Sequence, residues 1–300
     1  MSDAFAKSTV LVVLLASVML AADQPGGAGT AADGKAALRM MTFNIRFNEP
    51  KDGLDNWRFR RDDVAELFRA QRIDVAGLQE ALRDQIDDLA KRLPQFAWYG
   101  VGRDDGKSKG EFSPIFFRKD RFALVLKGTF WLSDQPEKVG SKGWDAALPR
   151  VASWVKLRDK STGVQWTVFN AHFDHRGERA REASAGLLVK KMPEIARDSL
   201  IVLLGDFNET TKASFYRVLT EGDAATRFKL ADAKVVSTTP HAGLDTTWNG
   251  FKSAVPGQQI DHIFVGPKIE VRSHQIPDTR RGERFLSDHF PVIADVAAAK

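Results

Sequence analysis

Short apolar runs recur along the chain and predict a series of buried strands. The clearest run is 201–204, four aliphatic residues in a row, which is typical of a strand covered on both faces. Further apolar or alternating runs predict strands at 38–43, 73–78, 98–102, 114–117, 122–126, 151–157, 164–169, 260–265 and 290–297. Apolar residues at helical spacing predict helices at 57–71, 85–93 and 179–196. We expect 212–230 to be helical and then irregular, and 245–248 to form a short extended piece.

The order of these elements indicates the fold class. Strands outnumber helices, and hairpins such as 151–169, which turns at Ser161-Thr162-Gly163, are frequent. This pattern favours an α/β fold with two packed β-sheets flanked by helices over a simple βαβ array. No internal repeat and no obvious linker follows residue 36. We therefore expect one domain over residues 37–300.

The N-terminal segment has a different character from the rest. Residues 10–22 form an almost unbroken apolar run, preceded by Lys7 and followed by a polar Asp-Gln-Pro-Gly-Gly sequence. The run is too short for a settled transmembrane helix but fits a signal peptide, although an uncleaved anchor is the alternative. We expect a signal peptide at 1–22, a flexible lead-in at 23–36, and no transmembrane segment in the mature chain. The expected location is periplasmic or secreted.

The amino-acid composition limits the kinds of site and partner that the protein can have. The chain has no cysteine, which excludes disulfides, thiolate metal sites and cysteine nucleophiles. Its net charge of +5 and pI near 9.3 suit an anionic partner. The basic residues are nevertheless interspersed with acids, as at 58–63, and form no long Lys/Arg stripe of the kind expected for a nucleic-acid track. A phosphate ester is compatible with this mild basicity.

Polar residues stand where the predicted strands end. Asp206 and Asn208 follow the run at 201–204, and their spacing places both side chains on one face of extended backbone. Active sites of α/β proteins usually lie at such strand ends, although an Asx turn alone would explain this pair. Comparable residues recur at other strand ends: Asn44, Glu80, His172, Asp261, Asp288 and His289. A shared polar centre explains so many polar residues at strand ends better than separate turns and caps do.

Five segments that contain these residues resemble a known family. They are 41–44 (Met-Thr-Phe-Asn), 78–80 (Leu-Gln-Glu), 205–208 (Gly-Asp-Phe-Asn), 260–263 (Ile-Asp-His-Ile) and 287–292 (Ser-Asp-His-Phe-Pro-Val). In this order they resemble the motifs of the endonuclease/exonuclease/phosphatase superfamily, across residues 38–297. The resemblance implies a DNase I-like four-layer α/β sandwich of two mixed sheets, with the site at one rim.

The resemblance also implies a metal site. Glu80 would bind the cation through its carboxylate, and Asn44 and Asp288 would complete the protein ligands. Because these groups offer oxygen and the chain has no thiol, Mg²⁺ or Mn²⁺ is the expected ion.

Four further residues would act on the water and the phosphate. The resemblance implies that Asp206 orients or deprotonates the attacking water and that Asn208 binds the pentacovalent phosphate. His289 would pair with Asp261, which fixes its tautomer and supports its positive charge. Whether Asp206 or His289 removes the proton from the water stays open at this point.

A second imidazole and three more polar residues complete the predicted site. His172 would contact the phosphate, supported by Glu111. Arg103 and Arg150 lie near predicted rim loops, where they would clamp an anionic substrate or serve as ordinary surface cations. Asp174 shares the face of His172 and is a weaker candidate for contact with substrate or metal.

The functional hypothesis is an exported, metal-dependent phosphoesterase that hydrolyses a phosphodiester or phosphomonoester with an activated water. The alternatives are a nonspecific nuclease and a non-catalytic binding module. Segment 80–83 lacks the lysine of the related repair nucleases, and 259–262 lacks the Cys-Asp-Arg of the inositol phosphatases. The chain looks most similar to exported bacterial members. No protein partner is implied, and we expect a monomer.

Overall fold

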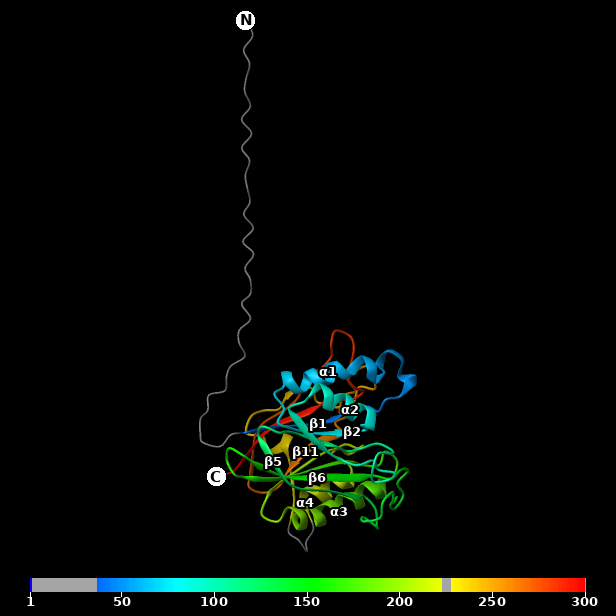
Figure 1. Ribbon diagram of the computed structural model, residues 1–300, viewed down its shortest axis with the longest axis vertical. Helices are drawn as coiled ribbons and strands as arrows, with labels where there is room; N and C mark the ends of the chain where they lie inside the picture. Colours follow the sequence, from blue (N-terminus) through cyan, green and yellow to red (C-terminus); the bar gives the residue numbers. More distant parts are fainter. Residues whose placement is uncertain (2–36, 223–227, 300) are drawn as a thin grey trace. The chain divides into compact units, whose positions relative to one another are not determined.

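The computed structural model describes Met1 and residues 37–222 and 228–299 (Figure 1). The described residues from 37 onward belong to one compact unit. The predicted signal peptide and lead-in, apart from Met1, lie outside the described residues. Within those residues, no helix is long and apolar enough to cross a membrane.

The first sheet has seven strands. In spatial order they are β10 (Ala242–Gly243), β12 (Ile269–Ile276), β13 (Val292–Ala298), β1 (Leu38–Asn44), β2 (Val75–Gln79), β4 (Ile115–Arg118) and β3 (Phe96–Tyr99). At its centre β1 runs parallel to β2 and antiparallel to β13. The sheet is therefore mixed.

The second sheet has six strands. Their spatial order is β5 (Phe122–Trp131), β6 (Val151–Asp159), β7 (Gln165–His172), β8 (Leu200–Asp206), β11 (Asp261–Val265) and β9 (Ala231–Asp232). Here β7 and β8 are parallel, and β11 is antiparallel to β8. Each sheet thus has a central parallel pair with an antiparallel neighbour.

Helices cover the outer faces of both sheets (Figure 1). Helices α1 (Trp57–Ala70) and α2 (Arg83–Arg92) lie over the first sheet, and α3 (Glu178–Ala196) and α4 (Ser214–Glu221) lie over the second. A 3-10 turn, η1 (Pro50–Asp55), precedes α1, and the short α5 (Ala233–Val236) follows β9. The expected four-layer sandwich is confirmed.

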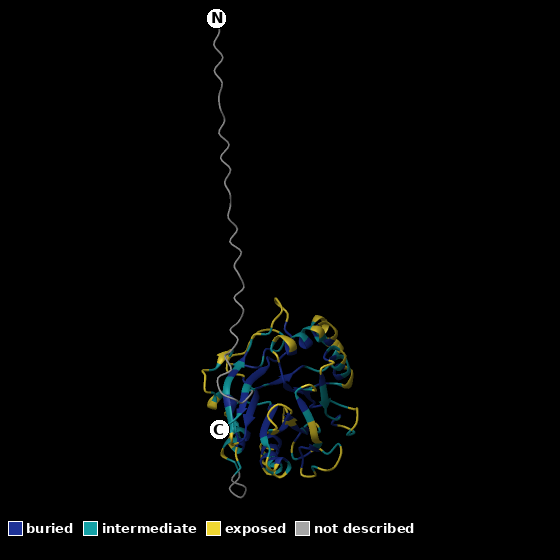
Figure 2. Ribbon diagram, turned by 60° about the vertical axis from the view of Figure 1, so that its left-hand side comes forward, coloured by how far each residue is buried: buried dark blue, intermediate teal, exposed yellow. Residues whose placement is uncertain are grey.

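Three layers of buried apolar side chains stabilise the sandwich (Figure 2). One lies between the two sheets, and one lies between each sheet and the helices that cover it. Strand β8 shows how its sequence serves two of them. Val202 and Leu204 point into the layer between the sheets, whereas Ile201 and Leu203 pack with the layer beneath α3 and α4. An unbroken aliphatic run is therefore needed here, because both faces of the strand are covered.

Several predicted boundaries differ from the structure. Strand β12 was not predicted, because its alternation of apolar with charged and polar residues carries few large apolar side chains. The expected strand at 98–102 is wrong in position, since β3 ends at Tyr99. Residues 245–248 form no named strand and contribute a single bridge, between Trp248 and His289. The last strand begins at Val292 instead of residue 290.

A buried histidine in β12 makes stability depend on pH. The Nδ1 atoms of His274 and His241 lie 2.9 Å apart, and Nε2 of His274 is buried without a hydrogen-bond partner among the described residues. Burial lowers the pKa of His274 to about 3. The folded chain therefore keeps this imidazole neutral at pH values where the unfolded chain protonates it, below about 6.5.

We predict that acidification destabilises the wild type more than a His274→Gln variant. Between pH 6.5 and 5, the wild-type free energy of unfolding should fall by about 2 kcal/mol more than that of the variant, because each pH unit contributes about 1.4 kcal/mol. Urea unfolding at both pH values measures this difference. Equal losses in the two proteins would show that His274 is readily protonated in the fold.

Candidate active site

Sheet topology brings the predicted site residues to one rim. Strands β1, β2, β7 and β8 are parallel in pairs, so the carboxyl ends of each pair lie together. Strand β11 starts at the same rim, because it runs antiparallel to β8. His172 pairs in register with Asp206, and Asp206 pairs with Asp261. Residues that pair directly across strands point to the same face, so these three side chains stand in a row.

Asn44 joins this row to the other sheet. Its Nδ2 donates to Oδ2 of Asp206 at 2.8 Å and to Oε1 of Glu80 at 3.1 Å. A second polar link lies beside it, where Nε2 of Gln79 donates to Oδ1 of Asn170 at 2.6 Å. All of these side chains are buried except that of Glu80, which is partly exposed. The two sheets are therefore held together by hydrogen bonds at the rim where the predicted site lies.

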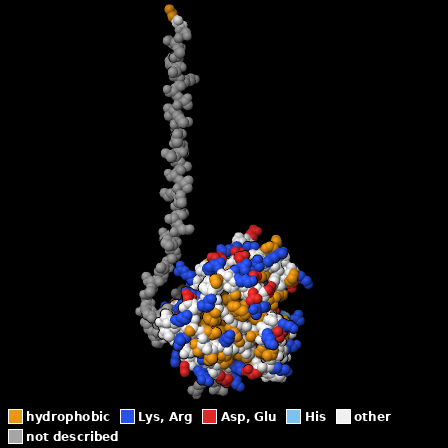
Figure 3. Space-filling model, in the orientation of Figure 1, with side chains coloured by type: hydrophobic (Ala, Val, Ile, Leu, Met, Phe, Trp, Pro, Cys, Tyr) orange, Lys and Arg blue, Asp and Glu red, His pale blue; other side chains and the backbone are white. Residues whose placement is uncertain are grey.

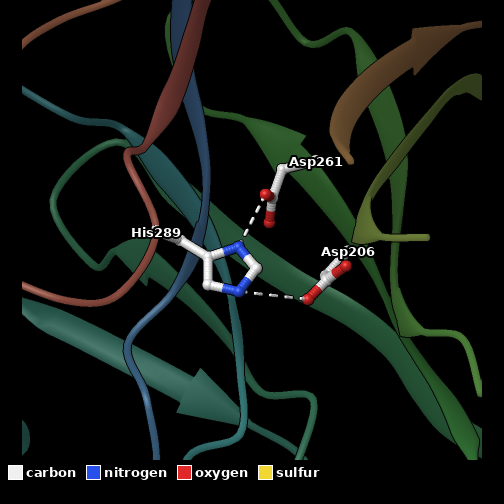
Figure 4. Close-up of side chains that lie close together, drawn as sticks. All are labelled: Asp206, Asp261 and His289. Atoms are coloured by element: carbon white, nitrogen blue, oxygen red, sulfur yellow. Dashed lines mark hydrogen bonds and ion pairs between the residues drawn. The ribbon is translucent and has the colours of Figure 1, made fainter. Parts of the chain in front are cut away.

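His289 lies between two carboxylates (Figure 4). Its Nδ1 is 2.8 Å from Oδ2 of Asp261, and its Nε2 is 3.8 Å from Oδ2 of Asp206. The edge of the Trp248 ring packs against the imidazole, with ring centroids 4.9 Å apart. The backbone N–H of Asp261 donates to the hydroxyl of Thr247 at 3.2 Å, which helps to fix the pair.

This arrangement sets the charge on both neighbours. Burial alone would lower the pKa of His289, but the carboxylates of Asp261 and Asp206 outweigh it and raise that pKa to about 10. Burial and the nearby Asp261 carboxylate raise the pKa of Asp206 to about 6. At neutral pH, His289 is therefore a cation and Asp206 is mostly ionised.

The three predicted metal ligands lie next to this pair. Glu80 receives the amide N–H of Phe47 at 3.3 Å, and Asp288 receives the hydroxyl of Ser287 at 3.1 Å. The guanidinium of Arg46 lies 3.9 Å from both Glu80 Oε2 and Asp288 Oδ2. Burial and the charge of Asp288 raise the pKa of Glu80. A divalent cation between these oxygens would relieve that repulsion, so the donor set fits a hard metal ion.

Asp206, Asp261 and His289 also bring three potential ligand atoms within 4.8 Å of one another. A metal there would have to displace the proton that binds His289 to Asp261. The cationic state of His289 makes this costly. We therefore favour the oxygen set of Glu80, Asn44 and Asp288 as the ion site.

Backbone strain also marks this region. Arg46, Glu80 and Asn208 have φ values of 55°, 59° and 55°, in the left-handed region that side chains generally avoid. Such residues persist where the surrounding structure holds them, and they cluster at functional sites. Each of the three directly follows or lies near the end of a central strand.

His172 and Asn208 form a second pair on the other side of Asp206. Nδ2 of Asn208 lies 2.9 Å from Nε2 of His172 and also donates to the carbonyl of Phe173 at 2.9 Å. Burial and the charges of Arg150 and Arg103 lower the pKa of His172, which stays neutral. Both hydrogens of the Asn208 amide are thus engaged, so donation to a phosphate would require one of these bonds to break.

Beyond His172 lies a group of buried ion pairs. Arg103 donates to both oxygens of Glu111, at 2.7 and 2.8 Å, and Nδ1 of His172 is 3.7 Å from Glu111. Arg150 pairs with Asp174 at 3.4 Å. The carboxylate of Asp174 also accepts four backbone N–H groups, so it anchors the loop at 147–148 to the start of α3.

The two arginines keep free donors inside this group. Nε of Arg103 and Nη1 of Arg150 are buried and have no hydrogen-bond partner among the described residues. Both arginines line a small hollow with Glu111 and His172. Contact of Arg103, Arg150 or Asp174 with substrate stays a prediction. Nε of Arg103 lies 4.0 Å from Oδ1 of Asp104, Nη1 of Arg150 lies 4.0 Å from Oε2 of Glu111, and Asp174 is already fully engaged.

Sequence reasoning assigned no role to Arg46, Gln79, Asn170 or Trp248. The signal for the first three was present, because each is polar and lies in or directly after a predicted apolar strand. Nothing in the sequence could indicate the contact of Trp248 with His289, because a loop brings the two together.

Comparison with known proteins places this geometry in a family. The sequence model of the endonuclease/exonuclease/phosphatase family matches residues 41–289. The chain belongs to this family. The matched segment includes Asn44, Glu80, His172, Asp206 and His289, which the structure brings to one rim.

Two solved structures and one curated relative illustrate the similarity. An endonuclease/exonuclease/phosphatase protein of Bacteroides vulgatus is 40% identical, covers 88% of this chain and all of its own, and has a TM-score of 0.84. A mannosyl-6-phosphatase of Bacteroides thetaiotaomicron is 37% identical, with 86% and 99% coverage and a TM-score of 0.79. An uncharacterized protein of Acanthamoeba polyphaga mimivirus is 24% identical over 85% of this chain and 98% of its own. The protein is thus a phosphoesterase of this family.

We predict that Asp206→Asn and His289→Ala each lower kcat by about 10²-fold or more, the usual scale for losing acid–base assistance. Hydrolysis of p-nitrophenyl phosphate and of bis(p-nitrophenyl) phosphate measures the change. Asp62→Asn, on the exposed face of α1, is the matched control and should turn over at the wild-type rate. Near-normal turnover in a folded site variant would remove that residue from the mechanism.

Proposed function

We propose that the protein is an exported, Mg²⁺- or Mn²⁺-dependent phosphomonoesterase that acts on a phosphorylated sugar. The observation that carries the hydrolytic part is the pairing of an ionised, buried Asp206 with a cationic His289 beside the oxygen set of Glu80, Asn44 and Asp288. The export part depends on the apolar segment at 10–22.

The charges of Asp206 and His289 suggest separate roles. A general base must be unprotonated near neutral pH, and Asp206 with a pKa of about 6 meets this condition. His289 with a pKa of about 10 already holds a proton and is not available as the base. Asp206 would accept the proton of the attacking water, while His289 stabilises charge on the phosphoryl oxygens. The metal ion, when bound, would supply Lewis-acid stabilisation of the phosphate.

The free donors of Arg103 and Arg150 support a monoester. A phosphomonoester carries up to two negative charges and three terminal oxygens, whereas a diester carries one charge and two such oxygens. Arg103 and Arg150 are each paired with a carboxylate, but they still add positive charge beside His172 and therefore favour the monoester. The 37% identity with a mannosyl-6-phosphatase supports a sugar as the alcohol part.

A nuclease is the second candidate. The net charge of +5 favours it, since phosphate backbones attract basic proteins. On the face shown in Figure 3, however, basic and acidic side chains lie interspersed without a continuous basic stripe. This distribution gives weaker support to a long polyanion than to a small phosphoester.

The deciding experiment is a metal-supplemented substrate screen. With Mg²⁺ or Mn²⁺, the protein should hydrolyse hexose 6-phosphates faster than DNA, RNA or bis(p-nitrophenyl) phosphate, and EDTA should abolish turnover. An Arg150→Met variant should lose more monoesterase than diesterase activity, because it removes the extra cation. Activity unaffected by chelation would contradict the metal assignment, and a preference for nucleic acid would favour the nuclease.

A further inference from the structure

Helix α3 covers the outer face of the second sheet (Figure 1). A surface groove is lined by residues of this helix and of the loop that contains Trp144. It consists of two hollows of about 670 Å³ each, and Trp144, Ala183 and Gly186 line both of them. None of its lining residues belongs to the predicted catalytic set. Trp144 and two small residues of α3 are thus shared by the two hollows.

The backbone at Trp144 is unusual. The N–H of Ala146 donates to the carbonyl of Gly143 at 3.0 Å and closes a tight turn over 143–146. Trp144 occupies the first central position of this turn with a φ of 53°. That conformation is normally taken by glycine, asparagine or aspartate, and a bulky side chain there is strained.

Contacts on both sides hold the turn in place. Gly143 lies so close to the neighbouring loop that a Cβ added to it would be 2.4 Å from the Cα of Ser133. On the other side, the carboxylate of Asp145 accepts the N–H groups of Ala180 at 2.7 Å and Arg179 at 3.3 Å, at the start of α3. The direction of the indole is therefore set by the surrounding structure.

Among the described residues, the indole of Trp144 makes no hydrogen bond and no contact with another ring. The residue is half-buried. By contrast, Nε1 of Trp57 donates to Asp88 at 3.1 Å, and Nε1 of Trp131 donates to the carbonyl of Arg103 at 2.7 Å. A strained backbone that holds a partly exposed ring without hydrogen bonds is consistent with an external ligand.

We propose that this groove binds a neutral saccharide. The apolar C–H face of a sugar ring would lie on the indole, as flat apolar surfaces do on aromatic rings. Carboxylates and cations surround the indole together, so they can accept from and donate to the hydroxyl groups: Asp145, Glu178, Glu182, Glu194, Arg179, Lys190 and Lys191. Because both signs of charge line the groove, a ligand that carries several charges of one sign would be repelled by some of these residues.

The floor of the groove fits the same ligand. Gly186 is exposed on α3, and a Cβ built there would meet nothing within 4 Å. A larger residue would fit the helix and improve its intrinsic stability, since glycine is unfavourable inside helices. Because position 186 carries no such side chain, a sugar ring has room to approach the helix backbone beside Trp144.

Binding can be measured by ¹⁹F NMR on protein labelled with 5-fluorotryptophan. The Trp144 signal, one of seven tryptophan signals, is assigned by its loss in Trp144→Phe. Titration with neutral trisaccharides of glucose, mannose, galactose and N-acetylglucosamine should shift this signal, with a Kd on the order of 1 mM for the best of them. The proposed phosphatase reaction is not required for this result.

Two variants separate binding from folding. Gly186→Gln fills the groove without strain and should weaken binding at least about tenfold, whereas Ala70→Gln, which adds the same side chain to exposed helix α1, should leave it unchanged. Trp144→Gly removes both the ring and the strain, so isothermal calorimetry should detect no binding while Tm stays within about 3 °C of the wild type.

The proposal is overturned if no trisaccharide moves the Trp144 signal, or if Gly186→Gln binds as tightly as the wild type. A proline-rich peptide is the competing ligand, because its rings also pack on an exposed indole. A shift caused by that peptide and by no sugar would identify a peptide-docking surface and likewise contradict the proposal.

Discussion

The carboxylate of Asp206 is the group on which the two halves of the site depend. It is almost fully buried, it ends the central strand of one sheet, and it receives the Asn44 amide of the other sheet at 2.8 Å. A buried carboxylate is costly unless hydrogen bonds and opposite charge compensate it. The Asn44 amide, the backbone N–H of Asn208 at 2.8 Å and the cationic His289 supply that compensation. The contacts that stabilise this buried carboxylate therefore also connect the two sheets and set the charge state of the site.

Several residues around Asp206 have strained backbone conformations, and this strain costs free energy. Glu80 and Asn208 lie just after central strands and have positive φ values of 59° and 55°. Each such residue costs on the order of 1 kcal/mol or more, and the apolar layers on both sides of the sheets offset it. The same contrast between a rigid scaffold and a strained turn recurs at Trp144, on the outer face.

The sequence was sufficient to predict the layers and most of the rim. Continuous apolar runs such as 201–204 indicate strands covered on both faces, and the polar residue at each strand end then identifies the rim. Prediction from the sequence failed where the pattern is weak. The few apolar residues of β12 are separated by charged and polar ones, so no strand was predicted there. It also could not resolve the contact of Trp248 with His289, because long-range proximity leaves no local pattern.

The motifs leave open which group takes the proton of the water, and the charged surroundings of His289 support our proposal that Asp206 does so. Two carboxylates flank His289, and they raise its pKa above the ordinary value of 6.5, to about 10. The folded protein therefore keeps the imidazolium up to about pH 10. The stability that this raised pKa contributes is complete below about pH 6.5 and is lost as the pH rises from there through about 10.

Heteronuclear ¹H–¹⁵N NMR of the His289 ring in metal-free protein tests this claim most directly. The account predicts a doubly protonated ring from pH 6 to 9 that becomes neutral near pH 7 in an Asp261→Asn variant, since that change removes its nearest charge. A neutral His289 at pH 7 in the wild type would contradict the account, because the imidazole would then compete with Asp206 as the base.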